Sequence, residues 1–401
     1  MSTLDELIAE LCPNGVEYIN LGDFASISRG GNFQKKDFAD EGIPCIHYGQ
    51  IYTVYKLFTD KTVSCINHEA AKKSKFASPN DIIMAITSEN VEDVCKSVAW
   101  LGSENIAVSG HTAIIHHNQN PKYLSYFFHS SMFFSQKKTL VHGTKVIEVT
   151  PDKLKSIQIP LPPIPIQEEI VRILDTFTEL EAELEAELEA RKKQYEYYKN
   201  KLLNSDSIHN VKIMTLGDIG PVCMCKRILK GETEPIGEVP FYKIGTFGKK
   251  PDAFISKEKF EQYKKEYSFP KKGDVLISAA GTIGRAVIYD GKPAYFQDSN
   301  IVWIDNDESK VLNKYLYYFY LTNPWPISKG GTIDRLYNEN IRRTKLAIPP
   351  LSEQKRIVAI LDRFDALCND LTSGLPAEIE ARRKQYEYYR DKLLTFREAK
   401  T

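Results

Sequence analysis

Residues 190–203 read ARKKQYEYYKNKLL, and residues 381–394 read ARRKQYEYYRDKLL. Eleven of these 14 positions are identical, and the three differences keep size and polarity. The likeness continues upstream, where PPIPIQEEIVRILDTF at 162–177 matches PPLSEQKRIVAILDRF at 349–364. A module that occurs twice in one chain predicts a fold with internal pseudo-two-fold symmetry, which suits a ligand or partner that also has two halves.

The composition is that of a soluble globular protein. The chain has 401 residues, enough for two or three domains, with 42% hydrophobic and 26% charged residues. No apolar run approaches the roughly 20 residues that cross a bilayer, and the acidic start MSTLDELIAELCP does not resemble a signal peptide. The seven cysteines are scattered and odd in number, which favours reduced thiols. We therefore expect a cytoplasmic protein without a membrane segment.

The formal net charge of zero is distributed unevenly along the chain. Segment 211–347 contains 22 Lys and Arg against 16 Asp and Glu, whereas segment 159–210 contains 6 against 11. Nucleic-acid-binding proteins usually carry a basic surface. Because only segment 211–347 is clearly basic, the total charge alone does not predict DNA binding.

The halves upstream of the repeated helices are related more weakly, for example through Leu21-Gly22-Asp23 and Leu216-Gly217-Asp218. Each contains short apolar, β-branched runs bounded by turn residues, namely IIMAIT, SVAWL and TAIIHH in the first and DVLISA, AVIYD and NIVWID in the second. KYLSYFFHSSMFF at 122–134 and NKYLYYFYLTN at 313–323 predict one amphipathic helix per half, with the aromatic residues buried. We expect α+β domains at 1–158 and 211–347, with helical segments at 159–210 and 348–401.

The two helical segments carry a coiled-coil pattern, in which apolar residues alternate at spacings of three and four. The simplest packing is antiparallel, with each long helix against its twin. Ser373-Gly374-Leu375-Pro376 predicts a break or kink in the second helix near residue 374. The predicted helix seam consists of Leu174, Phe177, Leu184, Leu188, Tyr195, Tyr198, Leu202, Leu361, Phe364, Leu371, Tyr386, Tyr389 and Leu393.

Residues 180–191 read LEAELEAELEAR, a run of tandem tetrapeptides. As local physics, the run is a solvated acidic helix face built from strong helix formers. A sharper hypothesis is that the number of repeats sets the separation of the two domains, because one more tetrapeptide lengthens a helix by about 6 Å. That hypothesis depends on the ligand being DNA.

The paired RKKQYEYYKNKLL and RRKQYEYYRDKLL segments, with the two PP…Q…IV.ILD.F entries before them, resemble the specificity subunits of type I restriction-modification systems. In the second half, FYKIGTFGKKPDAFIS, ISAAGTIGRAVIYDGK and YFQDSNIVWID resemble the target-recognition domains of that family. The resemblance covers essentially the whole chain.

The resemblance implies an α+β protein with two target-recognition domains, separated by an antiparallel pair of long coiled-coil helices. Each domain would read one half of a split sequence in double-stranded DNA. The helices would dock two methyltransferase subunits, and restriction subunits would complete the complex. The chain itself would be non-catalytic and hold no cofactor; S-adenosylmethionine would belong to the methyltransferase, and ATP and Mg to the restriction subunit.

Two features depart from a regular repeat. The Ser373–Pro376 insertion makes the helices unequal, and TSENVEDVCKSVAWLG at 87–102 lacks the GTIGR loop of the second half. We therefore expect the halves to read different sequences, which gives an asymmetric target.

Most candidate DNA contacts are cations beside glycines or in turn-like runs, where Lys and Arg reach phosphates and the backbone can approach closely. Lys96 is a candidate because aligning the two halves places it opposite Arg285. For any one of them the plainer interpretation is a solvated surface charge. The candidates are Arg29, Lys96, Lys145, Lys226, Arg227, Lys243, Lys249, Lys250, Arg285, Lys329 and Arg335.

Tyr197 and Tyr388 fall off the seam, and we assign them to the methyltransferase interface.

The remaining motifs argue against a catalytic or metal site in this chain. The histidines and the Cys223-Met224-Cys225 run lack the spacing of a zinc site, so we expect no metal. No adenine-methyltransferase, phosphate-binding or nuclease motif is evident.

Two alternative functions stay open: a self-sufficient methyltransferase or nuclease, and a coiled-coil protein–protein scaffold without sequence-specific DNA binding.

Overall fold

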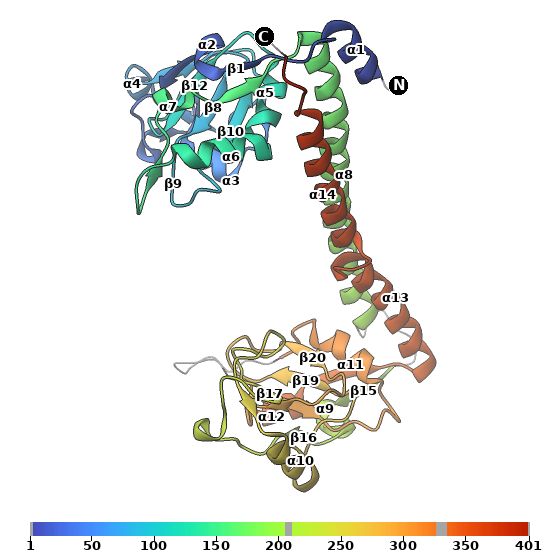
Figure 1. Ribbon diagram of the computed structural model, residues 1–401. Helices are drawn as coiled ribbons and strands as arrows, with labels where there is room; N and C mark the ends of the chain where they lie inside the picture. Colours follow the sequence, from blue (N-terminus) through green and yellow to red (C-terminus); the bar gives the residue numbers. More distant parts are fainter. Residues whose placement is uncertain (1–2, 205–210, 326–334, 400–401) are drawn as a thin grey trace. The chain divides into compact units, whose positions relative to one another are not determined.

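The computed structural model describes residues 3–204, 211–325 and 335–399 (Figure 1). The chain divides into two compact units, one of residues 1–184 with 379–401 and one of residues 185–378. The longest helix, α8 (Ile164–Leu203), contributes its first part to unit 1 and its second part to unit 2. Each unit therefore combines one globular domain with segments of both repeated helical regions.

The globular domain of unit 1 contains two five-stranded sheets, which Figure 1 shows among short helices. The first sheet has the order β2 (Ser26–Arg29), β12 (Thr112–His116), β8 (Ile82–Ala85), β10 (Ser97–Trp100), β5 (Phe58–Thr59). The second has the order β3 (Phe38–Ala39), β6 (Ser64–Ile66), β4 (Ile43–Ile46), β11 (Ile106–Val108), β7 (Lys75–Ala77). The predicted strands IIMAIT, SVAWL and TAIIHH are confirmed as parts of the first sheet.

These strands read as continuous apolar runs because the first sheet is buried on both faces. Alternate residues of β8 enter different core clusters: Ile82 and Met84 pack in one, Ile83 and Ala85 in the other. The first cluster also contains the aromatic residues of α5 (Pro121–Phe128) and the beginning of α8. The sheet therefore anchors the domain to its long helix.

The sequence predicted a single helix over 122–134, and this prediction is wrong. The chain forms α5 and then α6 (Ser131–Leu140), because the Ser130 side chain accepts a hydrogen bond from the Phe133 N–H and begins a new helix. In unit 2, α11 (Asn313–Tyr320) is the predicted single helix.

The globular domain of unit 2 repeats this plan with fewer strands. A four-stranded sheet has the order β16 (Val222–Met224), β22 (Ile301–Ile304), β19 (Val275–Ser278), β20 (Ala286–Ile288). A three-stranded sheet has the order β18 (Phe254–Ile255), β17 (Val239–Tyr242), β21 (Tyr295–Phe296). Again β19 sends Val275 and Ile277 to one core and Leu276 to the other. The three strands predicted here are confirmed.

Each globular domain is closed by a two-stranded antiparallel ribbon that joins its beginning to its end. The ribbons are β1 (Tyr18–Asn20) with β14 (Gln158–Pro160), and β15 (Lys212–Thr215) with β23 (Lys345–Ile348). The repeated Leu-Gly-Asp follows directly, as α2 (Leu21–Phe24) and α9 (Leu216–Ile219). The weak sequence repeat therefore marks equivalent positions in the two domains.

The shorter elements complete the two domains. In unit 1 they are α1 (Thr3–Leu11), the 3₁₀ turn η1 (Lys35–Asp37), α3 (Tyr48–Thr53), α4 (His68–Ala71), β9 (Thr87–Ser88), β13 (Ile147–Glu148) and α7 (Pro151–Leu154). In unit 2 they are the 3₁₀ turn η3 (Lys230–Glu232), α10 (Lys257–Glu266) and α12 (Asn338–Arg343).

In both units the helical segments pack antiparallel. In unit 1, α8 meets α14 (Leu375–Leu393): Phe177 stacks on Tyr389 at 5.4 Å between ring centroids, and Glu181 binds Arg383 at 2.8 Å. In unit 2, α8 meets α13 (Leu351–Asn369), where Tyr198 stacks on Phe364 at 5.7 Å. The predicted α+β fold with antiparallel coiled-coil helices is therefore confirmed.

The predicted break near residue 374 is also confirmed, because α13 ends at Asn369 and α14 begins at Leu375. Placing Leu371 on the helix seam was wrong. Leu371 lies in the turn between the two helices and is 79% exposed, since the chain leaves the helical path before it reaches this residue. All the other predicted seam residues are buried or half-buried.

Candidate nucleic-acid interface

In the first domain, a two-stranded ribbon organises the cationic side chains predicted from sequence. Strand β13 pairs antiparallel with β9 through Ile147 with Ser88 and Glu148 with Thr87. Glu148 holds Arg29, with Oε1 2.9 Å from the guanidinium Nη2, and Arg29 Nε donates to the Gly110 carbonyl at 2.9 Å. The ribbon thus fixes a half-exposed arginine at the end of β2.

Lys96 and Lys145 lie around the same ribbon. The Tyr52 hydroxyl donates to the Thr87 carbonyl of β9 at 2.7 Å, and Lys96 Nζ lies 6.0 Å from the centre of the Tyr52 ring. Lys96 also pairs with Asp93 at 2.6 Å, and this hydrogen bond is the main cause of the lowered pKa of Asp93. Lys145 is exposed in the bend just before β13. The structure therefore brings the three first-domain candidates together.

In the second domain, two loops carry most of the candidates. Arg285 Nη1 donates to the Phe247 carbonyl at 2.7 Å and so ties the 280–285 loop to the 243–250 loop. Phe247 is buried, while Lys249 and Lys250 beyond it are exposed. Lys243 pairs with Asp252 at 2.9 Å. Arg285 is therefore largely a support for the loop whose lysines face solvent.

Two further contacts define the 280–285 loop. Arg335 donates from Nη2 to the Ser299 carbonyl at 3.0 Å and forms an isolated antiparallel bridge with Ala280. Gly284 has φ +81°, and a Cβ on it would lie 2.5 Å from the Trp325 indole nitrogen. Only glycine fits this turn without displacing the tryptophan, so the loop has a defined shape.

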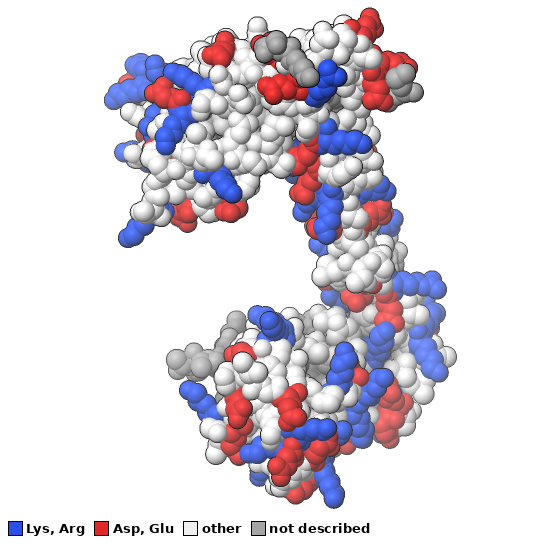
Figure 2. All heavy atoms as spheres, viewed as in Figure 1, with Lys and Arg blue, Asp and Glu red and all other residues white. Residues whose placement is uncertain are grey.

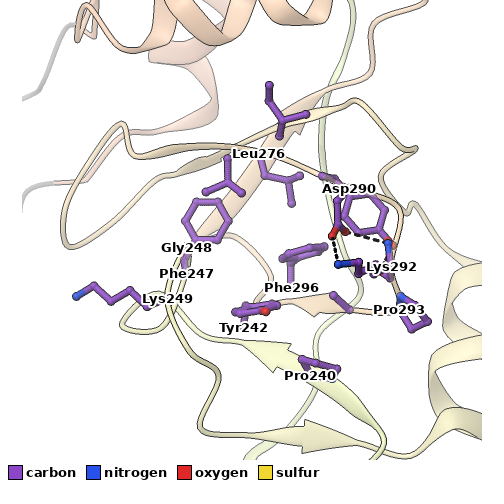
Figure 3. Close-up of a pocket in the computed structure, with 14 residues that line it drawn as sticks. Pro240, Tyr242, Phe247, Gly248, Lys249, Leu276, Asp290, Lys292, Pro293 and Phe296 are labelled. Carbon is purple, nitrogen blue, oxygen red and sulfur yellow. Dashed lines mark hydrogen bonds and ion pairs between the residues drawn. The ribbon is translucent and has the colours of Figure 1, made fainter. Parts of the chain in front are cut away.

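A recess of about 390 Å³ lies beside these loops (Figure 3). Its floor contains Tyr242 and Phe296, whose rings stack 5.8 Å apart with 16° between their planes. Asp290 and Lys292 close one side through an ion pair of 3.5 Å, and Lys249 points away from the recess. The stacked rings of Tyr242 and Phe296 thus support the backbone that presents Lys249 to solvent.

The remaining second-domain candidates lie elsewhere. Lys226 Nζ lies 5.0 Å from the centre of the Tyr267 ring, just after α10, and Arg227 is exposed beside it. The Lys226 carbonyl accepts a hydrogen bond from the Tyr295 hydroxyl at 3.0 Å. Lys329 lies outside the described residues.

The charge on the surface is mixed. Figure 2 shows Lys and Arg interspersed with Asp and Glu over the second domain, without a continuous basic field on the face shown. Lys96 and Lys243 pair with the partly exposed carboxylates of Asp93 and Asp252, and such ion pairs contribute little stability in water. They can therefore exchange a carboxylate for a phosphate at low cost.

The two tyrosines assigned to a partner interface occupy equivalent places on the helices. Tyr197 is 59% and Tyr388 62% exposed. Each packs edge-on against the next tyrosine, Tyr198 or Tyr389, with 5.3 Å between ring centroids and 77° between planes. Large exposed aromatic side chains on an otherwise packed helix are typical of protein interfaces.

Sequence reasoning missed a duplicated contact between each globular domain and its helix. In unit 1, Asp175 of α8 binds Lys122 Nζ at 2.6 Å and accepts from the Tyr126 hydroxyl at 2.7 Å. In unit 2, Asp362 of α13 binds Lys314 Nζ at 2.6 Å and accepts from the Tyr318 hydroxyl at 2.5 Å. The signal was present, since the aspartate of ILD and the Lys-x₃-Tyr spacing occur in both copies.

A second duplicated contact involves the glutamine of the same motif. Gln167 and Gln354 are both fully buried, and each donates to a proline carbonyl at 2.8 Å, that of Pro162 or Pro349. Each also accepts a backbone N–H from the start of the aromatic helix, from Asn120 at 3.1 Å or Leu312 at 2.9 Å. The repeated motif is therefore an anchor for the globular domain.

Among residues 3–204, 211–325 and 335–399 no group of three or more His, Cys, Asp or Glu could hold a metal ion. The seven cysteines are free thiols. Within the same ranges, no helix is long and apolar enough to cross a membrane.

Comparison with known proteins identifies the class. The model of the type I restriction modification DNA specificity domain matches residues 13–190 and again residues 208–381. These two matches cover most of the chain, and the chain therefore belongs to this family. The resemblance inferred from the paired helices is confirmed.

Individual relatives of known class support the same family assignment. The chain is 60% identical over 262 residues to a putative type I restriction enzyme specificity subunit of Haemophilus influenzae, spanning 63% of this chain and 68% of that protein. It is 36% identical over 270 residues to the specificity subunit of the Escherichia coli enzyme EcoR124I/EcoR124II, spanning 62% and 65%. The chain thus matches about two thirds of the length of each.

Solved structures share the fold over nearly the whole chain. A chain from a study of assembly and conformational transition in a type I restriction-modification system superposes with a TM-score of 0.63 at 17% identity, covering 96% of this chain and 98% of that one. The HsdS subunit of Thermoanaerobacter tengcongensis gives 0.51 at 18% identity, covering 96% and 97%. At these identities the likeness establishes the fold alone.

Proposed function

We propose that this chain is the non-catalytic, DNA-binding specificity subunit of a type I restriction-modification complex, and that it reads a bipartite, asymmetric target in double-stranded DNA. The duplicated architecture is the observation that carries the proposal. Each unit anchors a globular domain to its helix pair through the same aspartate and glutamine contacts. Two equivalent domains suit a target with two half-sites.

The half-sites differ because the loops that carry cations differ. The first domain presents Arg29, Lys96 and Lys145 around the β9–β13 ribbon, whereas the second presents Lys249 and Lys250 on a loop tied to Arg285. Phosphate contacts position such domains, and side chains at the base edges specify the sequence. Lys226, Arg227, Lys243, Lys329 and Arg335 stay proposed contacts of the second domain.

Catalysis belongs to the partners in this proposal. Two methyltransferase subunits dock on the equivalent exposed tyrosines Tyr197 and Tyr388, and restriction subunits complete the assembly. The methyltransferase supplies S-adenosylmethionine, and the restriction subunit supplies ATP and Mg. The chain holds no cofactor of its own. It acts in the cytoplasm, where DNA is accessible and free thiols stay reduced.

The test is to co-express the chain with its cognate methyltransferase in a host free of adenine methylation and to sequence the genome for modified adenines. One split motif with two unlike halves and a fixed gap is the expected result. A soluble complex with an active methyltransferase and no motif would refute the proposal.

The competing scaffold function predicts no specific DNA binding, so salt dependence separates the two. Each phosphate contact lowers the slope of log affinity against log salt by roughly 0.9. Replacing Lys145, which is exposed beside the β9–β13 ribbon, with Ala should make this slope shallower by about 1 in the assembled complex. Lys355→Ala, at an exposed lysine of α13, is the matched control and should leave the slope unchanged.

A further inference from the structure

Each globular domain is joined to its long helix by a three-residue clamp, made of one aspartate and a Lys-x₃-Tyr pair. The first clamp is Asp175 with Lys122 and Tyr126. The second clamp is Asp362 with Lys314 and Tyr318. Because the two domains have otherwise diverged in strand number and loop sequence, the repetition of this contact indicates a constraint that both domains share.

The clamps are well placed to resist tilting of the domain. Both tyrosines are buried, at 0% and 1% exposure; the side chain of Asp175 is 21% exposed and that of Asp362 34%. Lys122 Nζ also lies 4.3 Å from the centre of the Phe58 ring in β5, so it connects the helix to the sheet. The hydrogen bonds from the buried tyrosines to these carboxylates are charge-assisted, and such bonds are stronger than neutral ones.

Each clamp is also next to the contact that pairs the helices. Phe177, two residues after Asp175, stacks on Tyr389 of α14 with 25° between the ring planes. Phe364, two residues after Asp362, stacks on Tyr198 with 22° between the planes. One turn of helix therefore holds the globular domain on one side and the partner helix on the other.

We propose that Asp175 and Asp362 are positioning residues that fix the gap length of the DNA target. By holding each recognition domain at one angle to its helix pair, a clamp restricts the distance at which the domain meets its half-site. This inference rests on the proposed function. It adds that specificity for the gap depends on the clamps, separately from the side chains that read each half-site.

The test uses the complete complex in the methylation assay described above. Asp175→Asn and Asp362→Asn keep the side-chain size and remove the charge that holds the lysine. We expect both half-site sequences to persist in each variant, while methylation at gaps one base pair shorter or longer rises about tenfold relative to the native gap, as expected for loss of one charge-assisted hydrogen bond. Glu179→Gln, at an exposed glutamate on α8, is the matched control and should keep the single gap.

Tyr126→Phe and Tyr318→Phe provide a milder pair, because the ring packing stays and only the hydroxyl donor is lost. Should the Asn variants fail to accumulate as complex, these two should still broaden the gap distribution. A lower yield of methylation at the native gap alone, with no new gap length in any variant, would mean a purely structural role and would overturn the inference. A wild-type complex that produces no split motif would instead refute the proposed function.

Discussion

The buried hydroxyl of Tyr195 offers a test of how the helix pair of unit 2 is stabilised. Tyr195 is 6% exposed and its ring stacks on Phe364 with 6.1 Å between centroids. Its hydroxyl is buried, and no hydrogen-bond partner exists for it in the parts of the chain that the structure describes. Burial also raises the pKa of this hydroxyl well above its ordinary value.

Replacing Tyr195 with Phe keeps the stacked ring and removes the buried polar atom. An unsatisfied buried hydroxyl costs about 1–3 kcal/mol, so we expect the variant to gain about 1 kcal/mol of local stability. Tyr315→Phe is the matched control in the same core, because the Tyr315 hydroxyl donates to the Ala347 carbonyl at 3.1 Å. That variant leaves a buried acceptor unpaired and should lose about 1 kcal/mol.

The measurement is hydrogen exchange of the α13 amides at residues 351–369 in the full chain, which reports the opening of this helix. A gain of 1 kcal/mol slows exchange by a factor of about five. The reasoning fails if Tyr195→Phe exchanges faster than the unmodified chain, because the hydroxyl would then have a stabilising partner such as a bound water.

Three further predictions follow from the helices and the histidines. Leu361→Ala, at a fully buried position, should lose about 2–5 kcal/mol of stability, whereas Leu371→Ala in the exposed turn should change it by less than about 0.5 kcal/mol, as measured by the same exchange assay. The pKa values of His117 and His129 are lowered to about 4, chiefly by burial, from 6.5. In that interval the unfolded chain binds protons that the folded chain does not, so the first domain should be fully stable above pH 6.5 and lose stability as the pH falls to about 4. Near-ultraviolet circular dichroism against pH would check this, and a flat profile would contradict it. One added LEAE tetrapeptide within 180–191 should lengthen the target gap by one or two base pairs and leave both half-sites unchanged in the methylation assay, since it extends α8 by about 6 Å.

The duplicated contacts clarify how two diverged domains keep one role. The Asp175 and Asp362 clamps and the buried Gln167 and Gln354 repeat almost atom for atom, while the cation-bearing loops do not. In the proposed function, anchoring and reading are therefore carried by different residues. A recognition loop can change its sequence without disturbing the attachment of the domain, which is the arrangement a specificity subunit requires.

The duplication, the helix break and the main strands could be predicted from the sequence alone. These features are local: a period of three and four residues, a Gly-x-Pro interruption and short β-branched runs each select a backbone conformation without distant partners. Leu371 was misplaced because the periodicity was extended past Asn369, where α13 ends ahead of that interruption. The split into α5 and α6 was missed because a single capping serine, Ser130, decides it.

Which side chains meet depends on how the elements pack in the folded chain. Arg29 and Glu148 are 119 positions apart, and the β9–β13 ribbon that joins them with Lys145 has no signature in the sequence. Asp362 and Tyr318 belong to repeated sequence patterns, but their contact forms only where α11 packs against α13. Local propensity fixes elements, but hydrogen bonds and ion pairs between distant residues form only where packing brings two surfaces within about 3 Å. The two clamps are such contacts: their residues recur in both copies of the sequence, but the pairing between them is seen only in the folded chain.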